Sequence, residues 1–160
     1  MEHTCDIMTI AGRACDLFPD ADRDLVMVGS FLHDIGKVVE LDPSTFEYTA
    51  AGGLVGHLSL GFEMLSRTIS GIDGFPPELA MQLKHIILSH HGEYEQQSPV
   101  LPKTLEATLV YHADELVSQA NAVREIIRAQ APSGRTWSNF VSIKNRKYFL
   151  GSNQDTEKKA

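Results

Sequence analysis

Apolar residues recur along this chain at intervals of three and four, the spacing of an α-helix with one buried face. The pattern predicts helices over about residues 4–18, 22–39, 53–69, 76–92 and 102–130. Turn-forming glycine and proline clusters separate them, and residues 46–49 fit either a short strand or an extended loop. We therefore expect an all-α bundle of about five to six helices. The inward positions include Ile7, Ala11, Ala14 and Phe18; Leu25, Val28, Leu32, Ile35 and Val39; Leu58, Phe62, Leu65 and Ile69; and Leu79, Leu83, Ile86 and Ile87.

The length of 160 residues favours one domain with a sizeable core. We assign residues 1–130 to that helical domain and residues 131–160 to a tail that packs on it, with the last ten residues mobile. Apolar residues make up 42% and charged residues 22%, which is typical of a soluble globular protein. No apolar stretch is long enough to span a bilayer, and the N-terminus does not resemble a secretory signal. We expect a cytoplasmic protein with Cys5 and Cys15 reduced.

The formal net charge of −7 argues against a general nucleic-acid-binding surface, which is normally basic. It does not exclude a phosphorylated substrate, because bound divalent metals supply positive charge locally. Partners on a membrane are not expected, and the oligomeric state stays open.

Several of the seven histidines fall on the inward faces of the expected helices. Unpaired buried carboxylates and clustered imidazoles are energetically costly, and mutual hydrogen bonds rarely satisfy so many at once. Divalent metals satisfy them together, with imidazole nitrogens and carboxylate oxygens as ligands. We therefore predict a metal site built by one residue from each helix, with Asp34 beside His33. These residues are His3, His33, His57, His90 and Asp114.

The remaining histidines have simpler explanations. His91, the neighbour of His90, is equally well a metal ligand or a residue behind the ligands. His85 lies off the inward stripe, at the surface or behind the ligands, and His112 points to a different face from Asp114. A lone buried histidine is more often structural than metal-binding, so the prediction rests on the whole set.

The same series resembles the HD superfamily of metal-dependent phosphohydrolases over about residues 2–120. Its signature is His33-Asp34-Ile35-Gly36-Lys37, and the additional histidines resemble the two-metal branch of the superfamily. The resemblance implies an HD-domain helical bundle around a metal site. The chain has no Gly-Tyr-Pro motif, which argues against a cyclic-dinucleotide phosphodiesterase of the HD-GYP kind.

Several short segments of the sequence are similar to the HD domain of YhaM-type bacterial 3′–5′ exoribonucleases. The similar segments are residues 2–4, 56–58, 88–94, 98–107 and 137–151. In that family an OB-fold precedes the HD domain, whereas His3 is the third residue here, so we expect this chain to lack the OB-fold. The family pattern Asp-Asn-Leu-Asp is replaced by Asp114-Glu115-Leu116-Val117. We therefore expect a shortened reading frame or an excised C-terminal domain, with weak affinity for polynucleotides because the stacking platform and basic groove would come from the OB-fold.

The resemblance implies hydrolysis of a phosphate ester by a metal-bound hydroxide. Asp34 would bridge two ions, with His3, His33 and Asp114 completing one site. His57 and His90, with or without His91, would complete the other. Lys37 would offset charge on the phosphorane; the alternative is a solvated cation favoured by the end of a helix. Mn²⁺ or Fe suits such ligands, and Zn, Ni, Co and Mg stay open.

Three functions are compatible with this site. The first is a phosphodiesterase acting on RNA or short oligonucleotides, and the second is a small-molecule nucleotide phosphohydrolase. The third is a regulatory HD domain that binds metal without turnover. The sequence does not select the substrate.

Overall fold

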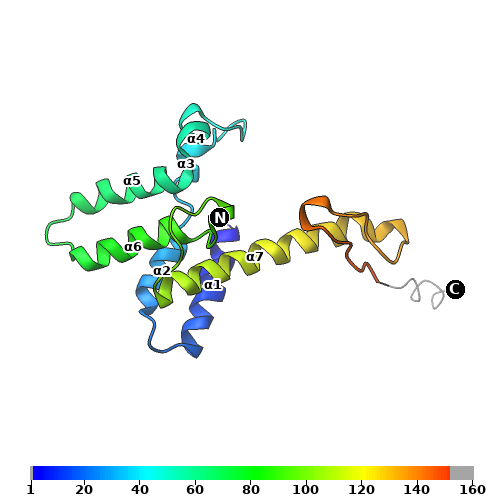
Figure 1. Cartoon of the computed structure of the whole chain (residues 1–160), viewed down its shortest axis with the longest axis horizontal. Helices are drawn as coiled ribbons and strands as arrows, with labels where there is room; N and C mark the ends of the chain where they lie inside the picture. The colour runs from blue at the N-terminus through cyan, green and yellow to red at the C-terminus, as the bar shows by residue number, and fades with distance from the viewer. Residues whose placement is uncertain (1, 152–160) are drawn as a thin grey trace. The chain divides into compact units, whose positions relative to one another are not determined.

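The described part of the chain, residues 2–151, is all α-helical in the computed structural model (Figure 1). Within it the only β-structure is isolated bridges, one of which joins Leu41 to Tyr48, so residues 46–49 form a loop and not a strand of a sheet. The predicted all-α class is confirmed. The helices are α1 (Glu2–Leu17), α2 (Arg23–Leu32), α3 (Lys37–Glu40), α4 (Ala50–Val55), α5 (His57–Ser70), α6 (Pro77–Ser89) and α7 (Leu105–Gln130), with 3-10 turns at Tyr94–Gln96, Ala131–Ser133 and Ser142–Lys144.

The chain divides within α7, after Glu115, into two compact units that we describe separately. In the first unit α1 packs on α2, α2 packs on α6, and α5 lies beside α6 in the opposite direction (Figure 1). Helices α3 and α4 pack together next to the start of α5. The core of this unit is aliphatic and includes Ile7, Ala11, Leu25, Val26, Leu58, Leu65, Leu83, Ile86, Ile87 and Val110.

The continuous helix expected over residues 22–39 is wrong, because α2 ends at Leu32 and residues 33–36 form a turn before α3. Gly36 explains the break: a Cβ there would lie 2.0 Å from the carbonyl oxygen of His57, so the turn packs directly on the backbone of α5. Val28 and Val39, expected to face inward, are 43% and 39% exposed. The break changes the direction of the chain, so Val39 in α3 no longer lies on the buried face of α2.

The helix expected over residues 53–69 is also two helices. Gly56 has a φ of 76°, a left-handed conformation that favours glycine, and it separates α4 from α5. His57 is therefore the first residue of α5 and lies at the N-terminal end of that helix.

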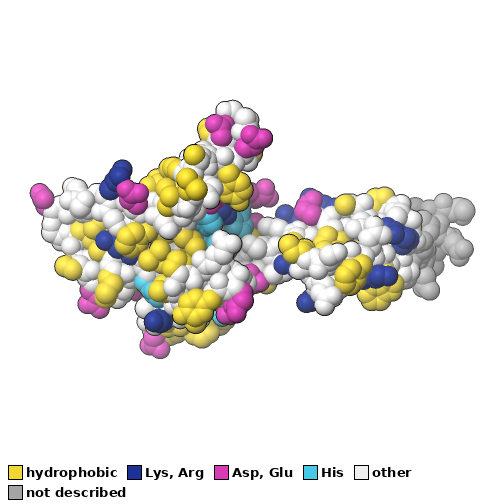
Figure 2. Space-filling view, turned by 45° about the horizontal axis from the view of Figure 1, so that its top comes forward, with side chains coloured by type: hydrophobic (Ala, Val, Ile, Leu, Met, Phe, Trp, Pro, Cys, Tyr) yellow, Lys and Arg dark blue, Asp and Glu magenta, His cyan; other side chains and the backbone are white. Residues whose placement is uncertain are grey.

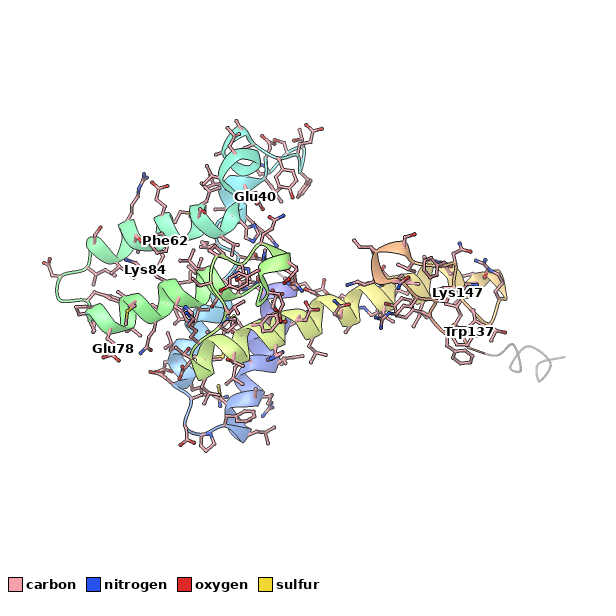
Figure 3. All side chains as sticks on the ribbon, viewed as in Figure 1. Glu40, Phe62, Glu78, Lys84, Trp137 and Lys147 are labelled. Carbon is pink, nitrogen blue, oxygen red and sulfur yellow. The ribbon has the colours of Figure 1, made fainter. Side chains whose placement is uncertain are left out.

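Two aromatic residues that were expected to face inward are partly exposed. Phe18 follows the end of α1 and is 47% exposed. Phe62 is 36% exposed, and the Lys84 amine lies 5.5 Å from its ring centroid, so a cation–π contact from α6 covers the ring (Figure 3). Both inward assignments were wrong, because Phe18 lies beyond the end of α1 and Phe62 in α5 faces solvent in part.

The second unit contains the rest of α7 and residues 131–151. Its backbone folds back on itself: Ser138 is buried, its N–H donates to the Tyr148 carbonyl at 2.9 Å, and Trp137 forms an antiparallel bridge with Phe149. That the tail packs on the helical domain stays a prediction. The predicted mobility of the last residues falls on positions 152–160, outside the described residues.

Two simpler predictions concern cysteines and membranes. Cys5 is exposed, Cys15 is buried, and neither forms a disulfide, as expected. Across the described residues, helices are all too short or too polar to cross a bilayer.

Candidate metal centre

The predicted ligands gather in the first unit, although they come from five different helices and the turns that follow them. Their ligating atoms form three groups, within each of which all atoms lie within 4.8 Å of one another. Histidines are visible at the surface of this unit (Figure 2). The groups are His57, His90 and His91; His3, His33 and Asp34; and His33, His90 and Asp114.

Asp34 lies at the middle of the cluster. Its Oδ1 is 3.5 Å from His57 Nε2 and 3.6 Å from His90 Nε2. Its Oδ2 is 3.3 Å from His33 Nε2 and 2.7 Å from Lys37 Nζ. The two oxygens of one carboxylate thus face histidines of different groups, which suits a bridging ligand. On the far side, His3 Nε2 lies 3.1 Å from Asp114 Oδ1.

Four of the histidines are oriented by a hydrogen bond from Nδ1. His33 Nδ1 lies 2.7 Å from the Ser30 carbonyl, and His90 Nδ1 lies 2.8 Å from the Ile87 carbonyl. Both histidines follow the last residue of a helix and use a carbonyl three residues back, which has no partner within the helix. His91 Nδ1 lies 2.8 Å from the carbonyl of Gln96.

His57 differs, because its Nδ1 lies 3.0 Å from the Glu40 carboxylate. All four acceptors require a proton on Nδ1, so the network assigns the tautomer that leaves a lone pair on each Nε2. These lone pairs point into the cluster, as metal ligation requires.

Burial leaves these inward atoms without partners. Among the described residues, five buried side-chain atoms make no hydrogen bond, and three of them are His33 Nε2, His90 Nε2 and Asp34 Oδ1. His33 and His90 are 0% and 1% exposed, so water does not compensate them. The Nε2 atoms of His57 and His91 lie 3.2 Å apart, where two lone pairs repel unless a cation lies between them. The donor set therefore fits divalent metal ions.

The electrostatics of the cluster favour an ionised Asp34. Burial alone would raise the pKa of this carboxyl, but the nearby imidazoles of His33 and His90 and the charge of Lys37 hold the pKa far below its usual range. Burial lowers the pKa of His90, which favours the neutral, ligating form of that imidazole.

A pocket of about 820 Å³ opens beside the cluster on the side of His57 and His91. Its size is in the range of small-molecule sites. Polar groups from α3, the start of α5 and the loop after α6 face it. The lining includes Lys37, Glu40, Tyr48, Gly52, Gly56, His57, Ser59, His91, Gln96 and Gln97.

Lys37 lines this pocket while its amine pairs with Asp34. It is the first residue of α3, a single turn, and its side chain is 45% exposed, so both its role toward a phosphate and the alternative of a solvated cation at a helix end stay predictions. The other two histidines lie outside the three groups, as expected. His85 Nε2 accepts the backbone N–H of Lys103 at 2.9 Å, and His112 is exposed beside Tyr111.

Sequence reasoning missed Glu40. The expected continuous helix placed it after Val39 at the end of an ordinary stripe, with no signal that it would turn inward. In the structure it is buried and contacts His57. An acidic residue three positions after Lys37, just before the Asp42-Pro43 turn, was the only available clue.

Comparison with known proteins agrees with this geometry. The family model for the HD domain matches residues 1–118. The chain belongs to the HD domain family. It is also 34% identical over 150 residues to the 3′-5′ exoribonuclease YhaM of Listeria monocytogenes, and 34% identical over 148 residues to that of Bacillus subtilis.

These matches cover 92% of this chain but 47% and 46% of the two relatives. The chain thus spans about half the length of the curated relatives it matches. The relative from Listeria welshimeri is 32% identical over 148 residues. No solved structure matches the chain.

Proposed function

We propose that this HD domain is a metal-dependent phosphodiesterase that hydrolyses phosphate esters of nucleotides or short RNA. The observation that carries the proposal is the set of buried, unpaired ligand atoms converging on Asp34. Three such atoms in one place destabilise the fold unless cations bind there. The names of the curated relatives add that similar chains belong to RNA-cleaving enzymes.

The ligand assignment divides the cluster about Asp34. His3, His33 and Asp114 would hold one divalent ion, and His57, His90 and His91 would hold the other. Ions held by these residues would supply an activated water and neutralise phosphate oxygens. Mn²⁺ and Fe are the favoured metals for this mixture of nitrogen and oxygen donors.

Lys37 and the pocket would act on the substrate. The Lys37 side chain is 45% exposed and lines the pocket, so its amine could turn from Asp34 to face a phosphate there. There it would stabilise negative charge that grows during phosphoryl transfer. The pocket volume of about 820 Å³ suits a nucleotide or a chain end.

A second candidate is a phosphohydrolase of free nucleotides. The net charge of −7 favours it, because an acidic chain repels a long polyanion more than a mononucleotide. Both candidates use the same metal centre and the same pocket.

One assay distinguishes these functions. The Mn²⁺-loaded protein is incubated with 3′-labelled RNA, with a nucleotide panel and with bis-p-nitrophenyl phosphate, alongside the Asp34→Asn variant. A phosphodiesterase cleaves the RNA and the bis-ester, whereas a nucleotide phosphohydrolase turns over the panel only. Metal binding without turnover of any substrate would contradict both and leave a regulatory domain.

The dependence on RNA length tests how much of the substrate this chain holds. We expect nearly constant kcat/KM from a dinucleotide to a 20-mer, because the pocket beside the metals is small. A steep rise with length, together with a strong salt dependence of binding, would reveal a separate nucleic-acid track. The exposed cations Arg146 and Lys147 would then be its first candidate residues.

A further inference from the structure

Glu40 is a buried carboxylate beside the proposed metal centre, at the end of α3 (Figure 3). It is 7% exposed, and its Oε1 accepts two hydrogen bonds from His57. One comes from the backbone N–H at 2.9 Å and the other from Nδ1 at 3.0 Å. A single oxygen thus fixes both the main chain and the ring of the first residue of α5. The positive end of the α5 dipole further favours a carboxylate in this position.

The backbone of Glu40 is itself held by the segment that follows it. The Thr49 N–H donates to the Glu40 carbonyl at 2.9 Å, and the Thr49 hydroxyl donates to the Val39 carbonyl at 2.9 Å. Gly52 in α4 packs so closely that a Cβ there would lie 2.2 Å from the Glu40 carbonyl oxygen. Residues 41–52 therefore hold the backbone of Glu40 in place, which keeps its side chain in contact with His57.

His57 is anchored differently from its neighbours. His33, His90 and His91 use main-chain carbonyls, which no side-chain substitution removes. The orientation of His57 depends on one side chain. A carboxylate partner also makes an imidazole a stronger metal ligand than a neutral carbonyl does.

We propose that Glu40 is a positioning residue that holds His57 as a ligand for the ion shared with His90 and His91. This proposal rests on the metal centre of the proposed function. It predicts an effect on one ion only, because the other groups of ligands, those around His3 and Asp114, make no contact with Glu40 among the hydrogen bonds and ion pairs of the described residues.

The test is a titration of the metal-free protein with Mn²⁺ by calorimetry and with Co²⁺ by visible absorption. Wild type should bind two ions. Glu40→Ala should weaken one binding event by about 10- to 100-fold and leave the other unchanged. Glu40→Gln should lose less, because the amide oxygen can still accept both N–H groups. The Co²⁺ absorption of the weakened site should change in both variants. Glu47→Gln, an exposed change in the same loop, is the matched control.

The melting temperature of each metal-free variant separates positioning from folding. If Glu40→Ala does not fold, Glu40→Gln carries the test. Unchanged affinity for both ions in Glu40→Gln and in any folded Glu40→Ala would overturn the inference while leaving the metal centre intact. Equal weakening of both ions would overturn it as well, because the effect would then not be confined to His57. A wild-type protein that binds no metal would instead refute the proposed function.

Discussion

The main chain of Gly36 lies directly against that of His57: a Cβ at position 36 would come within 2.0 Å of the His57 carbonyl oxygen and 2.7 Å of the Gly61 nitrogen. Backbone atoms cannot move aside as a flexible side chain can. Gly36→Ala should therefore push the turn that carries His33 and Asp34 away from α5. We expect a loss of roughly 3 kcal/mol in the free energy of unfolding, measured by urea denaturation, and weaker metal binding.

Gly53→Ala is the control for that change, since a Cβ at position 53 meets nothing within 4 Å and the residue lies inside α4. Alanine favours a helix over glycine, so this variant should be unchanged or more stable by up to about 1 kcal/mol. Equal stability of Gly36→Ala and Gly53→Ala would show that the contact between Gly36 and His57 is looser than described.

Asp34→Ala removes the carboxylate that faces histidines on both sides of the cluster. Metal content, measured by elemental analysis after dialysis, should fall from two ions per chain to fewer than one. Hydrolysis should disappear with it. Asp73→Ala, an exposed change, should keep both ions. Two ions per chain in the Asp34 variant would refute the assignment of this residue.

Metal removal should lower the melting temperature. The ions bind the folded state, in which the ligands are assembled, so each contributes about 2.7 kcal/mol when its free concentration is 100 times its Kd. Chelation would leave His33 Nε2 and His90 Nε2 buried without partners. Scanning calorimetry with Mn²⁺ and with a chelator measures the difference. Identical melting curves with Mn²⁺ and with the chelator would show that metal binding does not stabilise the fold.

His85 should make folding sensitive to acid. Burial, aided by the charge of Lys103, lowers the pKa of His85 below its ordinary value of 6.5. The unfolded chain then binds a proton more readily than the folded chain, so stability is fully present above pH 6.5 and is lost as the pH falls through the folded pKa. In metal-free protein, His85→Gln should reduce this loss between pH 7.5 and 5. His112→Gln, at an exposed position, should leave the profile unchanged.

The helical periodicity predicted the fold class and most of the inward positions that build the core. The gathering of the candidate ligands was also predictable, because His33, His90 and Asp114 stand where apolar residues belong. A polar residue that replaces an apolar one in a buried stripe needs a hydrogen-bonding or metal partner. Several such residues on different helices indicate that they share one partner, such as a metal ion.

The breaks within two predicted helices were not predictable from periodicity. The one at Gly36 depends on contact with His57, and the one at Gly56 depends on a left-handed φ, and neither interrupts the apolar pattern. For the same reason Glu40 was missed. Glu40 contacts His57 only because the break brings α3 against α5. This is a tertiary contact, and the local sequence pattern does not predict it.

Diffraction from crystals of the full chain grown with Mn²⁺ tests the central claim most directly, since anomalous scattering locates the ions. The account predicts two peaks on either side of Asp34, one contacting His57, His90 and His91 and the other contacting His3, His33 and Asp114. A single peak, or peaks that do not touch Asp34, would contradict it.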